Sequence, residues 1–270
     1  MRIALLADIH GNRLALDAVL ADIQRRGGVD GYWILGDLCA IGTDPAGVLE
    51  RLDTLLNVVG VAGNADRYVT SGNRPAPSFA QVRDNPDLIA TLAEVAGSFG
   101  WTQGFLEARG WLDWLAALPS EQRLTLPDST DVLLTHVAPG AADGKGLNPG
   151  LDDTELQAAL NGEAGDLICV GHFHMPMDRR LNGQHIVNPG AVSNNFAPDL
   201  RAAYAILNAN EQAYSIRHYR VDYDRAAAID HARRCSNPGA AYIVRLLEGQ
   251  VRASWMQCWD GRAYYPDFVE

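Results

Sequence analysis

The sequence has few of the features that mark secreted or membrane-bound chains. Among its 270 residues there are only four cysteines, at positions 39, 169, 235 and 258, and none are paired as CxxC. Such spacing disfavours a zinc knot and a secreted disulfide framework, so we expect free thiols in a reducing compartment. The first residues show no signal-peptide pattern, and no apolar run approaches a membrane span. We therefore expect a cytoplasmic protein without membrane contact.

Positive charge is also scarce. Lysine and arginine total 22 against 33 acidic residues, which gives a formal net charge of −11. A chain of this charge repels polyanions overall, and a nuclease needs a basic track for the backbone. Extended nucleic acid is therefore a disfavoured partner, and we favour a small substrate.

Short apolar runs bounded by glycine or aspartate predict buried strands. Helical patterns alternate with the first of them, and the second helix has Asp44 as a candidate N-cap and Pro45 at its first position. This β-α-β-α-β opening predicts an α/β fold with a largely parallel first sheet. The expected strands are 2–7, 32–35, 57–62, 131–135, 167–170, 184–187, 202–207 and 213–219, and the first helices 12–26 and 45–56.

Two segments differ from this pattern. Residues 71–78 are rich in Gly, Pro and Ser and predict a loop, and a helix is expected from 85 to about 96, followed by an aromatic-rich stretch. We interpret residues 70–120 as a helical insertion or lid on a single domain spanning 1–270. Helices at 223–234 and 239–247 and an aromatic tail at 255–265 form an expected C-terminal extension over about 221–270.

Side chains that ligate metals follow the predicted strands. In open α/β sheets, ligands gather at the carboxyl ends of strands. Carboxylate, imidazole and amide donors suit Mn, Fe and Zn. Seven such donors are too many for one metal with open positions, but they suit two metals that share a carboxylate and clamp a phosphate. The donors, in chain order, are Asp8, His10, Asp37, Asn64, His136, His172 and His174.

The order of these residues resembles the pattern of the calcineurin-like metallophosphoesterases. That family shows D-x-H, G-D, G-N, H and G-H-x-H in sequence. All five pieces are present here, as Asp8-Ile9-His10, Gly36-Asp37, Gly63-Asn64, His136 and Gly171-His172-Phe173-His174, and the resemblance covers about residues 1–207. The stretches "DIHGN", "GDLCAIGTDP" and "NPGAVS" resemble the small bacterial and archaeal branch of the family. Because the ordered set is far more specific than any single piece, it indicates this family strongly.

The resemblance implies a four-layer α-β-β-α sandwich of two mixed sheets. It also implies two divalent metals, with manganese expected first and Fe, Zn, Ni or Co as alternatives. A bridging hydroxide would attack the phosphate. The first metal would take Asp8, His10, Asp37 and His174. The second would take Asp37, Asn64, His136 and His172, with Asp37 as the bridge.

Substrate contacts are less specific in the sequence. Asn12 is a candidate for bonding a phosphate oxygen or for fixing its loop, and the planar fork of Arg67 suits a phosphate. Arg201 is a further candidate, with a structural ion pair as its alternative. We place Asp37, Asn64, Asp66 and Arg67 in the catalytic set, and leave a homo-oligomer open.

Ala65 departs from the commoner family pattern, in which a histidine follows the asparagine. That histidine is thought to contact phosphate and to protonate the leaving oxygen, which alanine cannot do. Asp66 is a candidate replacement acid if burial raises its pKa. Alternatively, a metal-bound water would protonate the leaving group, and the enzyme should then prefer activated diesters or cyclic nucleotides.

The expected function is therefore metal-dependent hydrolysis of phosphate esters, with phosphodiesters favoured. A phosphomonoesterase acting on a small molecule or phosphoprotein is the first alternative, because the two reactions use the same metals. A non-catalytic protein-binding scaffold of the same fold is the second, and the retention of every expected ligand argues against it.

Overall fold

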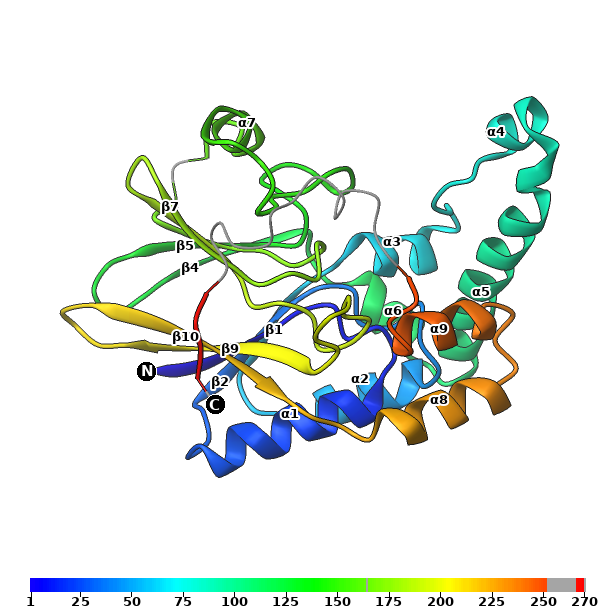
Figure 1. Ribbon diagram of the computed structural model, residues 1–270. Coiled ribbons are helices and arrows are strands. Elements are labelled where there is room, and N and C mark those ends of the chain that lie inside the picture. Colours follow the sequence, from blue (N-terminus) through cyan, green and yellow to red (C-terminus); the bar gives the residue numbers. More distant parts are fainter. Residues whose placement is uncertain (164, 252–265, 270) are drawn as a thin grey trace.

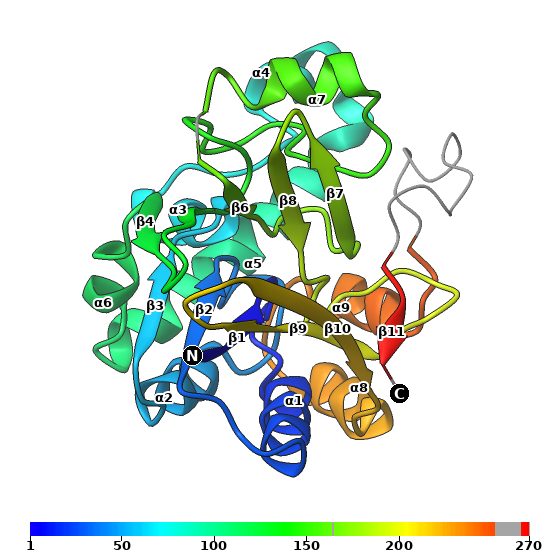
Figure 2. The ribbon, with the colours of Figure 1, turned by 90° about the vertical axis from the view of Figure 1, so that its left-hand side faces the viewer.

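Two β-sheets stacked face to face form the centre of the molecule, with helices on their outer faces (Figures 1 and 2). The computed structural model describes residues 1–163, 165–251 and 266–269. Helices α1 and α2 cover the outer face of one sheet, and α7 lies outside the other (Figure 1). This arrangement confirms the predicted four-layer sandwich.

The first sheet carries the predicted parallel opening. Within the described residues its strand order is β11-β10-β9-β1-β2-β3. Strands β1, β2 and β3 run parallel, whereas β9 pairs antiparallel with both β1 and β10. The strands are β1 (Arg2–Leu6), β2 (Gly31–Leu35), β3 (Val58–Val61), β9 (Ala202–Ala209), β10 (Tyr214–Val221) and β11 (Phe268–Val269).

The second sheet is also mixed. Its order in the described part of the chain is β4-β5-β6-β8-β7. The central strands β5, β6 and β8 are parallel, and antiparallel β4 and β7 close the two edges. The strands are β4 (Glu121–Thr125), β5 (Asp131–Thr135), β6 (Leu167–Cys169), β7 (Met177–Leu181) and β8 (Gln184–Asn188).

Alternation along the central strand divides the core into layers. Successive side chains of a strand point to opposite faces. In β1 and just beyond it, Leu5 and Ala7 face the second sheet, whereas Ala4 and Leu6 face the helical layer, and all four are fully buried. Burial on both faces accounts for the continuous apolar runs in the sequence.

The second helix begins as its capping residue predicts. Asp44 caps α2 (Pro45–Asp53), with its Oδ1 accepting from the Gly47 N–H at 3.0 Å. Helix α1 spans Arg13–Arg25. The predicted extension of the second helix to residue 56 is wrong, because the chain turns after Asp53 and Leu56 is 78% exposed.

Residues 70–120, interpreted from the sequence as an insertion, are largely helical, and the far end of this segment projects from the body of the molecule (Figure 1). The predicted end of its main helix near residue 96 is wrong, because α5 continues for 20 residues from Ile89 to Ala108. The other elements are α3 (Asn64–Ser71), α4 (Phe79–Asp84), the 3₁₀ turn η1 (Pro86–Leu88) and α6 (Leu112–Ala116).

The C-terminal helices pack at the end of the sandwich where α5 also lies (Figure 1). Helix α8 spans Arg225–Arg234 and α9 spans Ala240–Leu247, close to the predicted bounds. Helix α7, which the sequence did not indicate, spans Asp153–Ala159. The predicted aromatic tail at 255–265 lies outside the described residues.

Two expectations from composition concern thiols and membranes. Cys39, Cys169 and Cys235 are free thiols, as expected, and Cys258 lies outside the described residues. Within the described ranges, no helix combines the length and the hydrophobicity that crossing a bilayer requires.

Candidate metal centre

The seven predicted ligands come from both sheets and converge at one end of the sandwich. They occupy the turns that follow β1, β2, β3, β5 and β6. Because these strands are parallel within each sheet, their carboxyl ends share an edge. Donors separated by more than 160 positions in the chain are therefore neighbours in space.

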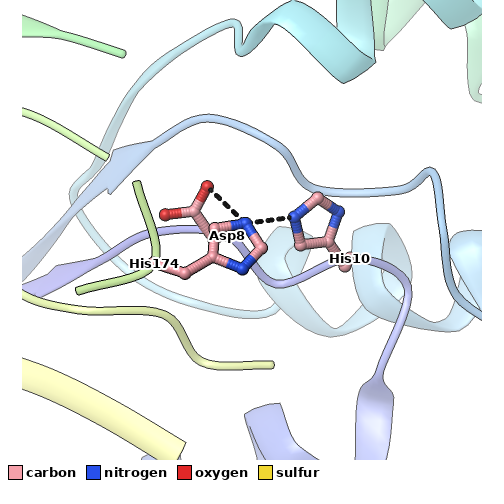
Figure 3. Close-up of side chains that lie close together, drawn as sticks. All are labelled: Asp8, His10 and His174. Atoms are coloured by element: carbon pink, nitrogen blue, oxygen red, sulfur yellow. Dashed lines mark hydrogen bonds and ion pairs between the residues drawn. The ribbon is translucent and has the colours of Figure 1, made fainter. Parts of the chain in front are cut away.

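One group of donors contains Asp8, His10 and His174, whose ligand atoms all lie within 4.8 Å of one another (Figure 3). The Nε2 atoms of the two histidines are 3.0 Å apart. His174 Nε2 also lies 3.6 Å from Asp8 Oδ1. Two imidazole nitrogens and a carboxylate oxygen directed into one small space form a suitable donor set for a divalent cation.

A second group contains Asp8, Asp37 and His136, again with all ligand atoms within 4.8 Å. Asp37 approaches both groups, because its Oδ2 lies 3.8 Å from His10 Nε2 and its Oδ1 lies 3.4 Å from His136 Nε2. Asp37 thus occupies the place that the resemblance assigns to a bridging ligand.

The amide oxygen of Asn64 lies beside the second group. Its Oδ1 is 3.1 Å from His136 Nε2 and 2.9 Å from His172 Nδ1. The structure therefore brings Asn64 and His172 against His136, as predicted. All seven predicted ligands belong to one continuous cluster of contacts.

Backbone carbonyls hold four imidazoles in position. The Nδ1 atoms of His10, His136 and His174 lie 2.9, 2.6 and 2.9 Å from backbone oxygens of residues 40, 35 and 194. Because a carbonyl only accepts, Nδ1–H must donate, which leaves Nε2 free for a cation. His172 is reversed: its Nε2 faces the Gly144 oxygen at 2.9 Å, and its Nδ1 faces the site.

The ligand turns adopt an uncommon backbone conformation. Five of the predicted ligands have positive φ angles between 48° and 71°, a region that few non-glycine residues occupy. Such conformations cost free energy and concentrate at functional sites. These five residues are Asp8, His10, Asp37, His172 and His174.

Burial and charge perturb the titration of these groups. Burial raises the pKa of Asp8 to about 6 and lowers the pKa of His174 to about 4. Burial opposes protonation of His136, but the Asp37 carboxylate outweighs it and raises the pKa of His136 to about 10. Mutual perturbation of this size in buried polar groups is typical of functional sites.

Asp8 provides a direct test of whether a cation fits. Its side chain is fully buried, and its Oδ1 accepts from the His172 N–H at 3.1 Å. Its Oδ2 is buried without a hydrogen-bond partner among the described residues. An unpartnered buried carboxylate oxygen is costly, and a divalent cation among these donors would satisfy it.

Close packing of the turns depends on Gly63. A Cβ built on this residue would lie 2.0 Å from Asp37 Oδ1 and 2.3 Å from the Asp37 nitrogen. Only glycine allows Asp37 to approach so closely. The glycine preceding Asn64 thereby helps to set the position of the predicted bridging ligand.

Ala65 and Asp66 are both buried behind the ligands. The Ala65 N–H donates to Asp37 Oδ1 at 2.8 Å, and its methyl group packs in the helical-layer core. Burial raises the pKa of Asp66 to about 7, as a general acid at this position would require. Yet its two carboxyl oxygens accept the N–H groups of Leu38 and Gly63 at 2.9 and 3.0 Å. These contacts hold the turns together, and an acid role for Asp66 stays a prediction.

The predicted substrate residues have local partners. Asn12 caps α1 and donates through Nδ2 to Ser193 Oγ at 2.9 Å, which is the loop-fixing alternative. Arg67 is exposed and donates to the Ala142 carbonyl at 2.7 Å, so its phosphate role stays a prediction. Arg201 forms an ion pair with Asp199 at 2.7 Å, in agreement with its structural alternative.

Asn194 contributes to the site and was missed from the sequence. Its carbonyl holds His174, and its Nδ2 donates to the Ile41 carbonyl at 3.1 Å. It thus ties the turn after β8 to the turn after β2. Its position in "NPGAVSNN", just beyond a predicted strand, was the available signal.

Solved structures with the same architecture include proteins from bacteria and archaea. The crystal structure of a metallophosphoesterase from Sphaerobacter thermophilus matches with a TM-score of 0.70 and 27% identity, over 93% of this chain and 99% of that one. Hypothetical protein PH1004 from Pyrococcus horikoshii OT3 matches with a TM-score of 0.75 and 19% identity, over 91% and 97% of the two chains. The second likeness concerns the fold alone.

Sequence comparisons agree with the structural ones. An uncharacterized protein of Methanocaldococcus jannaschii, MJ0912, is 29% identical over 240 residues, which cover 82% of this chain and 88% of that protein. The model of the calcineurin-like phosphoesterase superfamily domain matches residues 1–212. With its ordered motifs assembled at one end of a two-sheet sandwich, the chain belongs to the calcineurin-like phosphoesterase superfamily.

Proposed function

We propose that this chain hydrolyses small phosphodiesters at a centre of two divalent metal ions. The observation that carries the proposal is the position of Asp37, whose two carboxylate oxygens approach His10 of one donor group and His136 of the other. Backbone carbonyls also turn four imidazoles into the site. Such pre-orientation is characteristic of residues that ligate metals.

The ligand assignment is the one that the resemblance implies, and the contacts of Asp37 and Asn64 support it. Asp8, His10, Asp37 and His174 would hold one ion, and Asp37, Asn64, His136 and His172 the other. Bound ions would supply an activated water and neutralise the charge on the phosphate. We propose manganese as the resident metal, with Fe, Zn, Ni or Co as alternatives that these donors also accept.

The chain's own groups keep the site in a fixed geometry. The Ala65 N–H and the glycine at position 63 set the place of Asp37. Backbone carbonyl oxygens determine which ring nitrogen of each imidazole is free to bind a metal. Arg67, on the exposed side of α3, is proposed to contact a phosphate oxygen through its guanidinium.

The preference for diesters follows from Ala65. Side-chain general acids typically contribute about 10²–10⁴-fold to a rate. The buried methyl group of Ala65 offers no proton, so leaving groups that depart as stable anions should be favoured. With a net charge of −11 the chain should also favour small substrates over nucleic acids, and we propose that it acts in the cytoplasm.

The proposal is tested by replacing the bridging carboxylate. Hydrolysis of bis(p-nitrophenyl) phosphate and p-nitrophenyl phosphate is measured with added Mn²⁺ for wild type, Asp37→Asn and Asp84→Asn. Asp84 is the matched control, because its side chain is 72% exposed on the projecting insertion. We expect a faster diester reaction in wild type and in the control, and its loss in Asp37→Asn. Equal activity in all three proteins would refute the two-metal assignment.

A further inference from the structure

A cavity of about 410 Å³ opens between α5 and α9. Val95 and Phe99 line it from α5, and Tyr242 and Ile243 line it from α9. Its size is within the range of small-ligand sites, which are mostly apolar with a few directed polar groups. Aromatic rings on both helices make it suitable for a flat organic group.

The cavity shares a wall with a small pocket that reaches the candidate metal ligand His10. Ile41 and Ile243 line both the cavity and a smaller pocket that contains His10 and Asn194. The residue before Ile41 supplies the carbonyl that holds His10, and the Ile41 carbonyl accepts from Asn194. Ile41 has φ = 62°, which is a strained value for a β-branched residue. The fold therefore holds the Ile41 side chain at the junction of the two spaces.

Glu94 provides the directed polar group. It lines the cavity from α5, and its Oε1 is buried without a hydrogen-bond partner among the described residues. Arg245 also lines the cavity, but its guanidinium lies over the Tyr242 ring, 5.6 Å from the centroid. A buried acceptor without a donor is costly unless a ligand supplies one.

We propose that this cavity binds the organic group esterified to the phosphate. That group is a flat nitrogen heterocycle with an N–H donor, such as an amino-substituted nucleobase, and its N–H donates to Glu94 Oε1. The ring stacks among Phe99, Tyr242 and the aliphatic side chains of both helices. This inference rests on the proposed function, because it assigns the phosphate to the adjacent metal centre.

The test measures binding of nucleosides without phosphate, so that it does not depend on catalysis. Isothermal titration of the full chain compares adenosine with purine riboside, which has the same ring but no amino group. A hydrogen bond to a charged group typically changes the affinity of a ligand by about tenfold relative to a ligand that lacks the donor. We expect adenosine to bind about tenfold tighter than purine riboside.

Substitutions then assign the difference to Glu94. Glu94→Met should abolish it, and Glu94→Gln, which keeps a neutral acceptor, should restore part of it. Glu107→Gln is the matched control, since Glu107 is exposed on the same helix. Val95→Trp should fill the cavity and remove binding of both nucleosides. A cooperative thermal unfolding transition in each variant, at a midpoint close to that of wild type, would establish that the variant is folded.

The outcomes separate this inference from the proposed function. If adenosine binding depends on Glu94 but no diester is hydrolysed with any added metal, the ligand site in the cavity is supported and the proposed phosphodiesterase function is refuted. Diester hydrolysis together with equal or absent binding of the two nucleosides overturns the inference. Tighter binding of ethanolamine than of adenosine also overturns it, because an aliphatic amine makes no use of the rings.

Discussion

Gly63→Ala should damage the metal centre through a single methyl group. The added Cβ would lie 2.0 Å from Asp37 Oδ1 and 2.3 Å from the Asp37 nitrogen. Real Cβ contacts under 3.0 Å are essentially never seen, so Asp37 must move by about 1 Å. Metal–ligand distances tolerate only about 0.2 Å, so the displacement should disrupt the bridging position.

The expected cost has two parts. Overpacking of this kind destabilises a fold by about 1–3 kcal/mol. Loss of ligand geometry should lower metal affinity by about 10–100-fold, the range seen when groups that orient ligands are removed. Urea denaturation measures the first effect, and titration of the metal-free protein with Mn²⁺ measures the second.

Gly100→Ala is the matched control for this substitution. A Cβ at residue 100, inside α5, meets nothing within 4 Å. Alanine is the better helix former there, so this variant should gain up to about 1 kcal/mol of stability and keep its metal affinity. The reasoning is refuted if Gly63→Ala binds Mn²⁺ within twofold of wild type with an unchanged free energy of unfolding.

Three further predictions concern the acid step, the turns and the dependence of stability on pH. Rates on aryl and alkyl diesters should fall steeply as the leaving group becomes more basic, because the buried Ala65 side chain supplies no proton; a flat slope in the wild-type protein would contradict this. Asp66→Ala should lower the free energy of unfolding by about 2 kcal/mol or more, because it leaves two buried amides unsatisfied; an unchanged urea midpoint with a lower rate would favour an acid instead. Burial alone would raise the pKa of Asp199, but Arg201 and Arg220 hold it at about 2, below the ordinary 3.8. The carboxylate therefore stabilises the fold above about pH 4. The free energy of unfolding of wild type should exceed that of Asp199→Asn by about 1 kcal/mol at neutral pH, and this difference should shrink below pH 4. A difference that does not change with pH would contradict this.

The clustering of the seven candidate ligands was predictable because they follow strongly apolar strands. The apolar run at residues 2–7 predicts a buried strand. Because the neighbouring strands are parallel to it, its carboxyl end lies beside their carboxyl ends. By contrast, the edge strands β4 and β7 were missed. Their sequences, EQRLT and MDRRL, are polar because one side of each strand has no partner.

Features that depend on tertiary contacts could not be predicted from the sequence. The glycines at 97, 100 and 104 obscured the full length of α5, yet α5 continues through all three. The carbonyl of Asn194 reaches His174 only after two distant turns have met. Likewise, Glu94 and Tyr242 line one cavity although 148 positions separate them. Local pattern contains no information on such pairs.

The content of divalent metal in the purified chain tests the two-metal account most directly. Elemental analysis after mild purification and addition of Mn²⁺ should give two ions per chain. It should give one or fewer in Asp37→Asn, while the exposed control Asp84→Asn keeps two. A wild-type chain with one ion or none under these conditions, or an Asp37→Asn variant that retains two, would contradict the account.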